Sequence, residues 1–400
     1  MKRKKIYAII LCAAVFVTLL AACSDDAEEA LPDEAPPQTL EPLPAEPAED
    51  SEIDIQSYII DYDEAFAAFS PDTIMMTIGD YTVTWAELYA FIRNNISAIL
   101  QYGDIHDWSD IFYDDMSYAD IVLKNAGETA LTYKTVEYGA HKAGAVLSAE
   151  AVERMEEEYG MVAEQLGGEE ELLKLLWDID GISSRELFDY LRSVGYLIDA
   201  TIAKMYGENG ELLSDEDAAA YTILEGYLMA KHILRMKTEG DEDTALSEAE
   251  EILAKLDDYD GDDLHAYFND LMWEFTEDIN SYGYITFPDG YLFQYGDMVP
   301  EFYDACSALE IGAYSDIVET TYGFHIIYRL PIDFDTIPTG YFMQYEYGMI
   351  GEEDLMPLRN IIALELFDSE FGGWRDSLKV EYTSAYESLD LAKVFDVGAH

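Results

Sequence analysis

The chain has 400 residues, of which 22 are basic and 83 are acidic, so its formal net charge is -61 at pH 7. A field of this sign repels polyanions, which argues against nucleic acid as a partner and favours basic proteins or cations. An acidic surface composition without any specific partner is the alternative explanation. Hydrophobic residues make up 50% of the chain and 31 residues are tyrosine, which excludes a chain disordered throughout.

The first 23 residues contain four basic residues, an apolar run from Ile6 to Leu20 and the sequence LAAC. This order is typical of a secretory signal, and the run is shorter than the roughly 20 apolar residues of a membrane-spanning helix. The LAAC sequence resembles a bacterial lipoprotein processing site, which implies cleavage after Ala22 and lipid on Cys23. An ordinary signal peptide and an uncleaved anchor are the alternatives.

Residues 23–52 are predicted to be a tether between this anchor and the folded body. From residue 24 to residue 50 the chain is rich in acidic residues and proline, with no basic and no aromatic residue. Such a segment buries too little apolar surface to offset the entropy of ordering it. Beyond Cys12 in the signal and Cys23, only Cys306 remains, so no intramolecular disulfide framework is expected.

Residues 53–226 are predicted to be mainly helical. The apolar positions 88, 91, 92 and 96 repeat with the period of a helix after a short strand and turn. His106 and His141 lack the spacing of metal ligands, and we expect neither a metal site nor a cofactor. Helix starts are predicted from polar capping residues at Thr84 with Glu87, Ser148, Ser183 with Glu186, and Ser214.

From Tyr227 the pattern changes to a compact α+β module. YLMAKHILRMK alternates with a strand's period, placing His232 on one face and Lys231 on the other. Two helices follow, the first predicted to begin at a Ser247 to Glu250 capping box and the second spanning DLHAYFNDLMWEF. A strand at GYLFQ, a helix starting at Pro300 and the strand FHIIYRL complete the module.

Four segments in this order resemble a parvulin-type peptidyl-prolyl isomerase domain: AKHIL, GDMVPEF, ALEIGAYSDIV and YGFHII. The whole chain, with its lipoprotein signal and helical N-terminal region, is similar to the PrsA-type extracellular foldase lipoproteins. The resemblance implies an antiparallel sheet with surrounding helices at 227–335, flanked by or inserted in a helical chaperone-like domain. Residues 336–400 are then expected to pack on the N-terminal region, and residues 227–332 to fold alone.

The resemblance also implies the site. It assigns the proline cup to Met298 and Phe302, with Phe293 nearby. It places His232 and His325 side by side on adjacent central strands, orienting a third polar residue. That residue is matched best by Asp278, with Glu277 and Asn280 as alternatives. Taken without the resemblance, core packing is the favoured role of His325 and of the two apolar residues.

The predicted function is prolyl cis/trans isomerisation that assists exported proteins to fold outside the membrane, with unfolded proteins and proline-containing peptides as partners. The chain departs from the family in its glycines, since FPDGYLFQYGDM replaces the usual Gly-Gly-Asp-Leu-Gly run. A noncatalytic chaperone with a vestigial isomerase module is therefore the alternative. A solute-binding lipoprotein is disfavoured because it would need two α/β lobes.

Overall fold

The computed structural model describes residues 60–100, 105, 107–237, 240, 242–351 and 354–395. Two compact units are present: one joins the chain up to residue 204 to the chain from residue 368 onward, and the other comprises residues 205–367. The predicted signal, Cys23 and the predicted tether, like every residue before 60, lie outside the described residues. No described helix is both long enough and apolar enough to cross a membrane.

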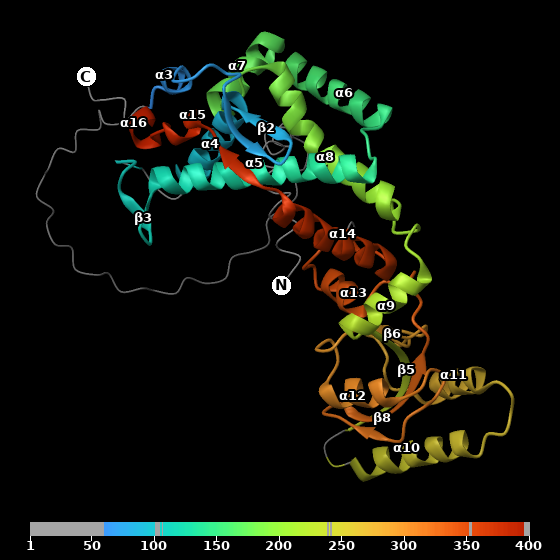
Figure 1. Ribbon diagram of the computed structural model, residues 1–400. Coiled ribbons are helices and arrows are strands. Elements are labelled where there is room, and N and C mark those ends of the chain that lie inside the picture. The colour runs from blue at the N-terminus through green and yellow to red at the C-terminus, as the bar shows by residue number, and fades with distance from the viewer. Residues whose placement is uncertain are drawn as a thin grey trace, which may run out of the picture. The chain divides into compact units, whose positions relative to one another are not determined.

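The first unit is mainly helical, as predicted for this part of the chain (Figure 1). The helix α8 (Arg185–Tyr206) continues past the unit boundary at residue 204, and α14 (Leu358–Ser377) crosses the boundary at residue 367. A short hairpin, β3 (Ile111–Tyr113) and β4 (Met116–Ser117), precedes the longest helix. The other helices of this unit are α3 (Tyr62–Phe66), α4 (Trp85–Leu100), α5 (Tyr118–Ala143), α6 (Ala149–Leu166), α7 (Glu169–Asp180), α8 (Arg185–Tyr206), α15 (Ser384–Glu387) and α16 (Leu391–Phe395).

Most of the predicted helix starts are confirmed by the hydrogen bonds of their caps. At the start of α4, Thr84 N donates to Glu87 Oε2 over 2.8 Å and Glu87 N donates to Thr84 Oγ1 over 3.3 Å. The cap predicted at Ser183 is wrong by one residue, because Ser184 Oγ accepts from Leu187 N over 3.1 Å. Ser148 and Ser214 cap α6 and α9 (Asp215–Glu225) as predicted.

A three-stranded antiparallel sheet joins the two ends of the described chain. Its order is β2-β1-β9, formed by β1 (Ile74–Ile78), β2 (Tyr81–Thr84) and β9 (Val380–Tyr382). Met76 lies opposite Tyr382, and Ile78 lies opposite Val380. Residues from 368 onward thus group with the N-terminal part of the chain, whereas residues up to 367 belong to the second unit.

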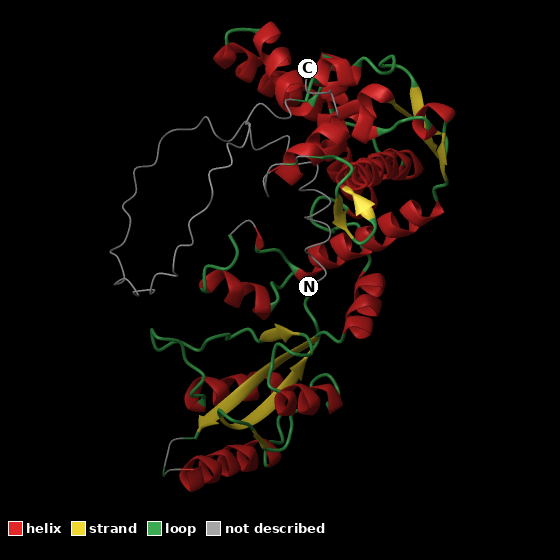
Figure 2. Ribbon diagram, turned by 90° about the vertical axis from the view of Figure 1, so that its left-hand side faces the viewer, coloured by secondary structure: helices red, strands yellow, loops and turns green. Residues whose placement is uncertain are grey.

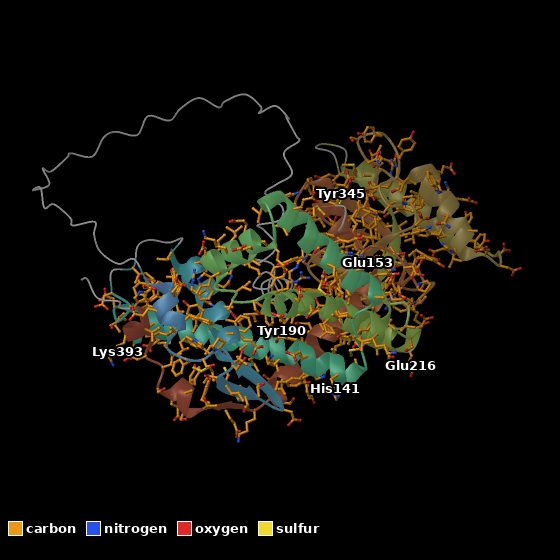
Figure 3. The ribbon with its side chains drawn as sticks, turned by 90° about the horizontal axis from the view of Figure 1, so that it is seen from above. His141, Glu153, Tyr190, Glu216, Tyr345 and Lys393 are labelled. Carbon is orange, nitrogen blue, oxygen red and sulfur yellow. The ribbon has the colours of Figure 1, made fainter. Side chains whose placement is uncertain are left out.

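A buried ion pair ties three helices of the first unit together. Lys134 of α5 is 5% exposed and donates to Glu87 of α4 over 2.8 Å and to Glu137 over 2.9 Å. Its third hydrogen bond goes to the hydroxyl of Tyr190 in α8, over 2.7 Å. Tyr190 is labelled in Figure 3. All three protons of the ammonium group therefore have acceptors, as a buried charge requires.

The second unit contains the four-stranded antiparallel sheet of the predicted α+β module. Its order is β6-β5-β8-β7, formed by β5 (Leu228–Met236), β6 (Tyr291–Phe293), β7 (Val318–Glu319) and β8 (Gly323–Leu330). The two long strands β5 and β8 run side by side at its centre (Figure 2). Helices α10 (Glu242–Asp257), α11 (Leu264–Phe275), α12 (Pro300–Ala308) and α13 (Thr339–Glu346) complete the unit together with α9.

The two faces of this sheet have different cores because strand residues alternate between them. One face carries Ile233 and Ile326 and packs on α10 and α11 around the fully buried Phe268. The other face carries Ala230 and Ile327 and packs on α12. The predicted capping box at Ser247 is wrong, since α10 begins five residues earlier, at Glu242.

The second unit is larger than the module predicted at 227–335. The core on the α11 face also contains Leu213 and Ala218, which precede that module, and Leu358 and Ile362 of α14, which follow it. Arg359 of α14 also links the two flanking segments directly, by donating a hydrogen bond to Leu213 O over 2.8 Å. Segments on both sides of the predicted module therefore complete its core.

Candidate active site

The two central strands bring His232 and His325 together. In the antiparallel register His232 lies opposite Ile327 and Leu234 lies opposite His325, so the two histidines are diagonal neighbours on one face. Their rings are nearly parallel, with centroids 5.1 Å apart, and their Nδ1 atoms are 3.0 Å apart. Both side chains are buried, at 8% and 4% exposure, so their nitrogens need partners inside the protein.

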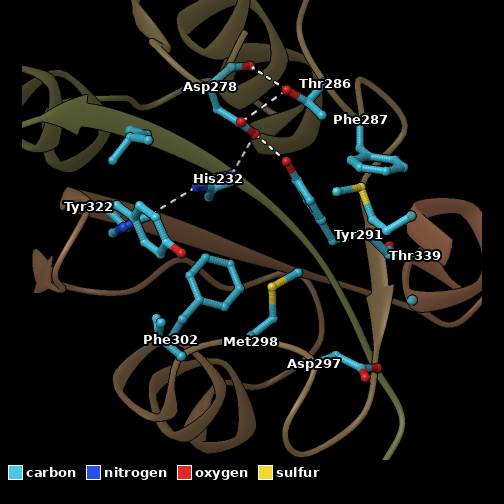
Figure 4. Close-up of a pocket in the computed structure, with 15 residues that line it drawn as sticks. His232, Asp278, Thr286, Phe287, Tyr291, Asp297, Met298, Phe302, Tyr322 and Thr339 are labelled. Atoms are coloured by element: carbon cyan, nitrogen blue, oxygen red, sulfur yellow. Dashed lines mark hydrogen bonds and ion pairs between the residues drawn. The ribbon is translucent and has the colours of Figure 1, made fainter. Parts of the chain in front are cut away.

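The loop after α11 supplies the carboxylate. Asp278 Oδ2 lies 3.0 Å from His232 Nε2 (Figure 4). Its two neighbours make other contacts: Glu277 pairs with Arg235 over 3.2 Å, and Asn280 Oδ1 accepts from the backbone of residues 282 and 284. Among the three candidates from the sequence, the structure therefore brings Asp278 to the histidine.

These contacts determine which ring nitrogen of each histidine carries a proton, because the side chains form one chain of hydrogen bonds. A carboxylate only accepts, so His232 Nε2 carries a proton and His232 Nδ1 is then the acceptor for His325 Nδ1–H. His325 Nε2 is left unprotonated and accepts from the hydroxyl of Thr320 over 2.8 Å. Every member of the chain from Thr320 to Asp278 is satisfied with both imidazoles neutral, and each ring holds the tautomer of the next.

The electrostatics agree with this assignment. Burial, together with the neighbouring His232, lowers the pKa of His325 to about 3, although the Asp278 charge opposes the shift. Burial raises the pKa of the Asp278 carboxyl, but the hydrogen bonds that it accepts from His232, Tyr291 and Thr286, and the attraction that a protonated His232 would add, outweigh burial and leave that pKa below its usual value. The site at neutral pH therefore holds a neutral His325 and an anionic Asp278.

Two donors to Asp278 were missed by the sequence analysis. Thr286 Oγ1 donates to Asp278 Oδ1 over 3.0 Å, and the Tyr291 hydroxyl donates to Asp278 Oδ2 (Figure 4). Burial, and then the Asp278 charge, raise the pKa of Tyr291, so it remains a protonated donor. The sequence offered one indication of Tyr291, because it directly follows Gly290 in the segment where this chain departs from the family's glycine run.

A pocket of about 530 Å³ opens beside this polar chain. Met298 and Phe302, the predicted cup, both line it, and the Phe302 ring meets both histidines edge to face with centroids 5.3 Å and 5.5 Å away. Phe293 does not line the pocket. Its side chain is fully buried behind Phe302, with ring centroids 5.7 Å apart, so it supports the cup from the core.

The pocket suits noncovalent chemistry on an apolar group that carries a polar amide. Cys306, the one cysteine among the described residues, lies on the buried face of α12, and burial raises its pKa to about 12 even though Arg329 opposes the shift. It is therefore a protonated thiol rather than a nucleophile. The apolar cup can hold a ring. The anionic carboxylate and the oriented imidazoles beside it can act on the charge distribution of the amide attached to that ring.

The fold and the site define a class of protein domain. Residues 232–330 match the Rotamase family, described as a PPIC-type PPIASE domain. The match begins at His232 and ends with β8, so it contains both histidines, Asp278 and the cup. This segment of the chain is therefore a peptidyl-prolyl isomerase domain of the parvulin type.

The relatives identified by sequence are foldases. The chain is 32% identical over 183 residues to "Foldase protein PrsA" of Halalkalibacterium halodurans, covering 44% of this chain and 49% of that protein. It is 30% identical over 172 residues to the protein of the same name from Oceanobacillus iheyensis, covering 42% and 44%. The aligned region thus spans about half the length of these curated relatives.

The crystal structure of the peptidylprolyl isomerase PrsA from Bacillus cereus also matches, with 20% identity, a TM-score of 0.28, and coverage of 67% of this chain and 90% of that one. The crystal structure of PrsA from Bacillus subtilis matches with 21% identity, a TM-score of 0.22, and coverage of 74% and 100%. The chain therefore contains a parvulin-type isomerase domain and, over somewhat less than half of its length, is similar in sequence to proteins named PrsA foldases.

Proposed function

We propose that this protein is a peptidyl-prolyl cis/trans isomerase and foldase that acts on unfolded exported proteins. The observation that carries the proposal is the satisfied chain from Thr320 through His325 and His232 to Asp278, which ends beside the cup of Met298 and Phe302. A core histidine pair kept only for packing needs neither an adjoining pocket nor a carboxylate with three donors.

The geometry supports a mechanism without a covalent step. Rotation about the prolyl amide passes a barrier of about 18–20 kcal/mol because conjugation must be broken. The planar amide carries partial negative charge on its carbonyl oxygen, and the twisted amide carries less. With the ring held by Phe302, an anionic Asp278 near that oxygen disfavours the planar form, so the site binds the twisted amide preferentially.

The test is exchange spectroscopy on an unphosphorylated proline peptide with wild-type and substituted protein. Phe302→Ala should weaken peptide binding and activity together, since it removes the ring that holds proline. Asp278→Asn should lower kcat about tenfold, equivalent to about 1.4 kcal/mol, with little change in peptide affinity. Asp304→Asn, an exposed carboxylate of the same helix as Phe302, is the matched control and should leave both unchanged.

The competing function is a chaperone that binds peptides without catalysis. Folded wild-type protein that binds the proline peptide but leaves its exchange rate at the uncatalysed value would establish it. The same result would remove the catalytic roles given above to Asp278 and the histidines.

We also propose that the protein is anchored by lipid on Cys23 to the outer face of the cytoplasmic membrane. The support is the LAAC sequence after a charged and apolar leader, followed by an acidic, proline-rich segment. Mass spectrometry of the membrane fraction should find an N-terminal acylated Cys23, and Cys23→Ser should abolish acylation. An unmodified mature N-terminus at another residue would rule out this anchor.

A further inference from the structure

One wall of the pocket comes from outside the segment that matches the isomerase family. That segment ends at residue 330, yet Thr339, Gly340 and Met343 line the pocket together with the residues of the cup. All three belong to α13, which begins nine residues after the match ends. A feature contributed by this helix therefore lies outside the segment that matches the isomerase family.

Specific contacts hold α13 against the site. The buried Thr339 hydroxyl accepts a hydrogen bond from Leu292 N of β6 over 3.1 Å, which anchors the first turn of the helix to the sheet. In the next turn the ring of Phe342 meets Phe287 edge to face, with centroids 5.5 Å apart. Phe287 in turn packs on Tyr291 at 4.6 Å, so the helix is joined through two rings to the donor that serves Asp278.

This wall creates apolar space beyond the proline cup. Figure 4 shows Tyr291 between Met298 and Phe302 on one side and Phe287 on the other. A pocket of about 530 Å³ is much larger than one pyrrolidine ring needs. Adjacent residues of a peptide have Cα atoms about 3.8 Å apart, so a neighbour of the bound proline reaches the Phe287 and Met343 side.

We propose that α13 forms a second subsite that selects a large apolar side chain next to the proline, with Met343 and Phe287 as its walls. Met343 is partly buried, and a flexible thioether against an aromatic ring accommodates aliphatic and aromatic side chains alike. The exposed carboxylate of Asp297, which also lines the pocket, disfavours an acidic side chain there. This subsite rests on the proposed function, because its ligand is the peptide that the cup holds.

The test measures peptide dissociation constants by calorimetry with the full chain, so it does not depend on turnover. Two series of proline tetrapeptides are compared, one with Leu, Ala or Glu before the proline and one with the same residues after it. In at least one of the two series, the wild-type protein should bind the Leu peptide roughly tenfold more tightly than the Ala peptide, and it should bind the Glu peptide most weakly. Met343→Ala should reduce that Leu-to-Ala ratio to about threefold or less.

Two further variants make the result specific. Met349→Ala removes a methionine that is 71% exposed, six residues along from Met343 and not part of the pocket, and should keep the wild-type ratio. Phe302→Ala should weaken all proline peptides alike, since it acts on the cup. An unchanged ratio in a folded Met343→Ala protein, or no apolar preference in either series, would overturn the subsite. The wild-type protein could also fail to accelerate prolyl exchange while Met343→Ala still lowers the Leu-to-Ala affinity ratio. That result would support the subsite and reject the proposed catalysis.

Discussion

Tyr291 controls how the carboxylate of Asp278 titrates. Its hydroxyl donates to the same oxygen that accepts from His232, and it stabilises the ionised form. Tyr291→Phe removes this donor, so the pKa of Asp278 should rise toward its usual value of about 3.9. The acid limb of the kcat/KM profile should then move to higher pH, while kcat at neutral pH, where Asp278 remains ionised, should change little. Tyr295→Phe, which changes a 72% exposed tyrosine, is the control. A profile identical to the wild type would show that Tyr291 only packs.

His325 makes the second unit sensitive to acid. Its pKa in the folded protein is about 3, below the roughly 6.5 of an unfolded histidine, so the unfolded chain binds the proton more readily. Its contribution is fully present above pH 6.5 and is lost as the pH falls toward 3, amounting to on the order of 4 kcal/mol. His325→Gln should flatten the decline of unfolding free energy between pH 7 and pH 4 in urea titrations. His265→Gln, an exposed histidine of the same unit, should leave the decline intact.

The residues of the site differ in how far the sequence could predict them. His232, His325 and Met298 lie in strands or at a helix start, where a period of two or a fixed spacing decides the face. Thr286 and Tyr291 instead act through hydrogen bonds to Asp278, which lies 8 and 13 residues earlier in the chain. Such bonds depend on the path of loops, and no local pattern specifies that path.

Helices and strands were predicted correctly where the hydrophobic periodicity and the capping residues indicate the same bounds. The strand of β5 was clear because its alternation matches burial on two different cores. The start of α10 was misplaced because Ser247 and Glu250 have the spacing of a capping box, although the helix had already begun at Glu242. Serine and glutamate at this spacing are equally compatible with an exposed helix interior, where no free backbone N–H group remains to be capped.

Helix α5 and the end of α14 pack so closely in the first unit that a methyl group between them is not tolerated. A Cβ built on Gly139 would lie 2.1 Å from Trp374 Cζ3. Gly139→Ala should therefore destabilise the first unit by about 1–3 kcal/mol despite alanine's higher helix propensity. Thermal unfolding measures this loss, and Gly127→Ala on the same helix, where no atom lies within 4 Å, should be neutral or stabilising. In a Trp374→Ala background Gly139→Ala should cost much less, and an equal cost in both backgrounds would contradict this contact.

At the level of the whole chain, the sequence indicated an isomerase module between helical segments but not where its core ends. The family pattern stops at the last strand, so the predicted boundaries followed the sheet. The observed boundaries at residues 204 and 367 instead follow hydrophobic packing, and both fall within helices. Domain boundaries are recognised in a sequence by a change of composition, such as a polar linker rich in proline or glycine. A boundary inside a continuous helix has no such change.

The boundaries of the second unit determine which fragment folds. In the core around Phe268, Leu213, Leu358 and Ile362 are buried, and all three lie outside residues 227–332. Losing a buried Leu or Ile costs about 2–5 kcal/mol, so losing three removes most of the roughly 5–15 kcal/mol that stabilises a typical domain.

We therefore expect the 205–367 fragment to unfold cooperatively in urea with dispersed amide resonances. The 227–332 fragment should show a broad transition and bind a hydrophobic dye, because part of its core is exposed. Leu358→Ala in the longer fragment should lower its unfolding free energy by about 2–5 kcal/mol, whereas Met349→Ala, at an exposed position, should change it little. Equal urea midpoints for the two fragments would show that the isomerase sheet is stable without its flanking helices.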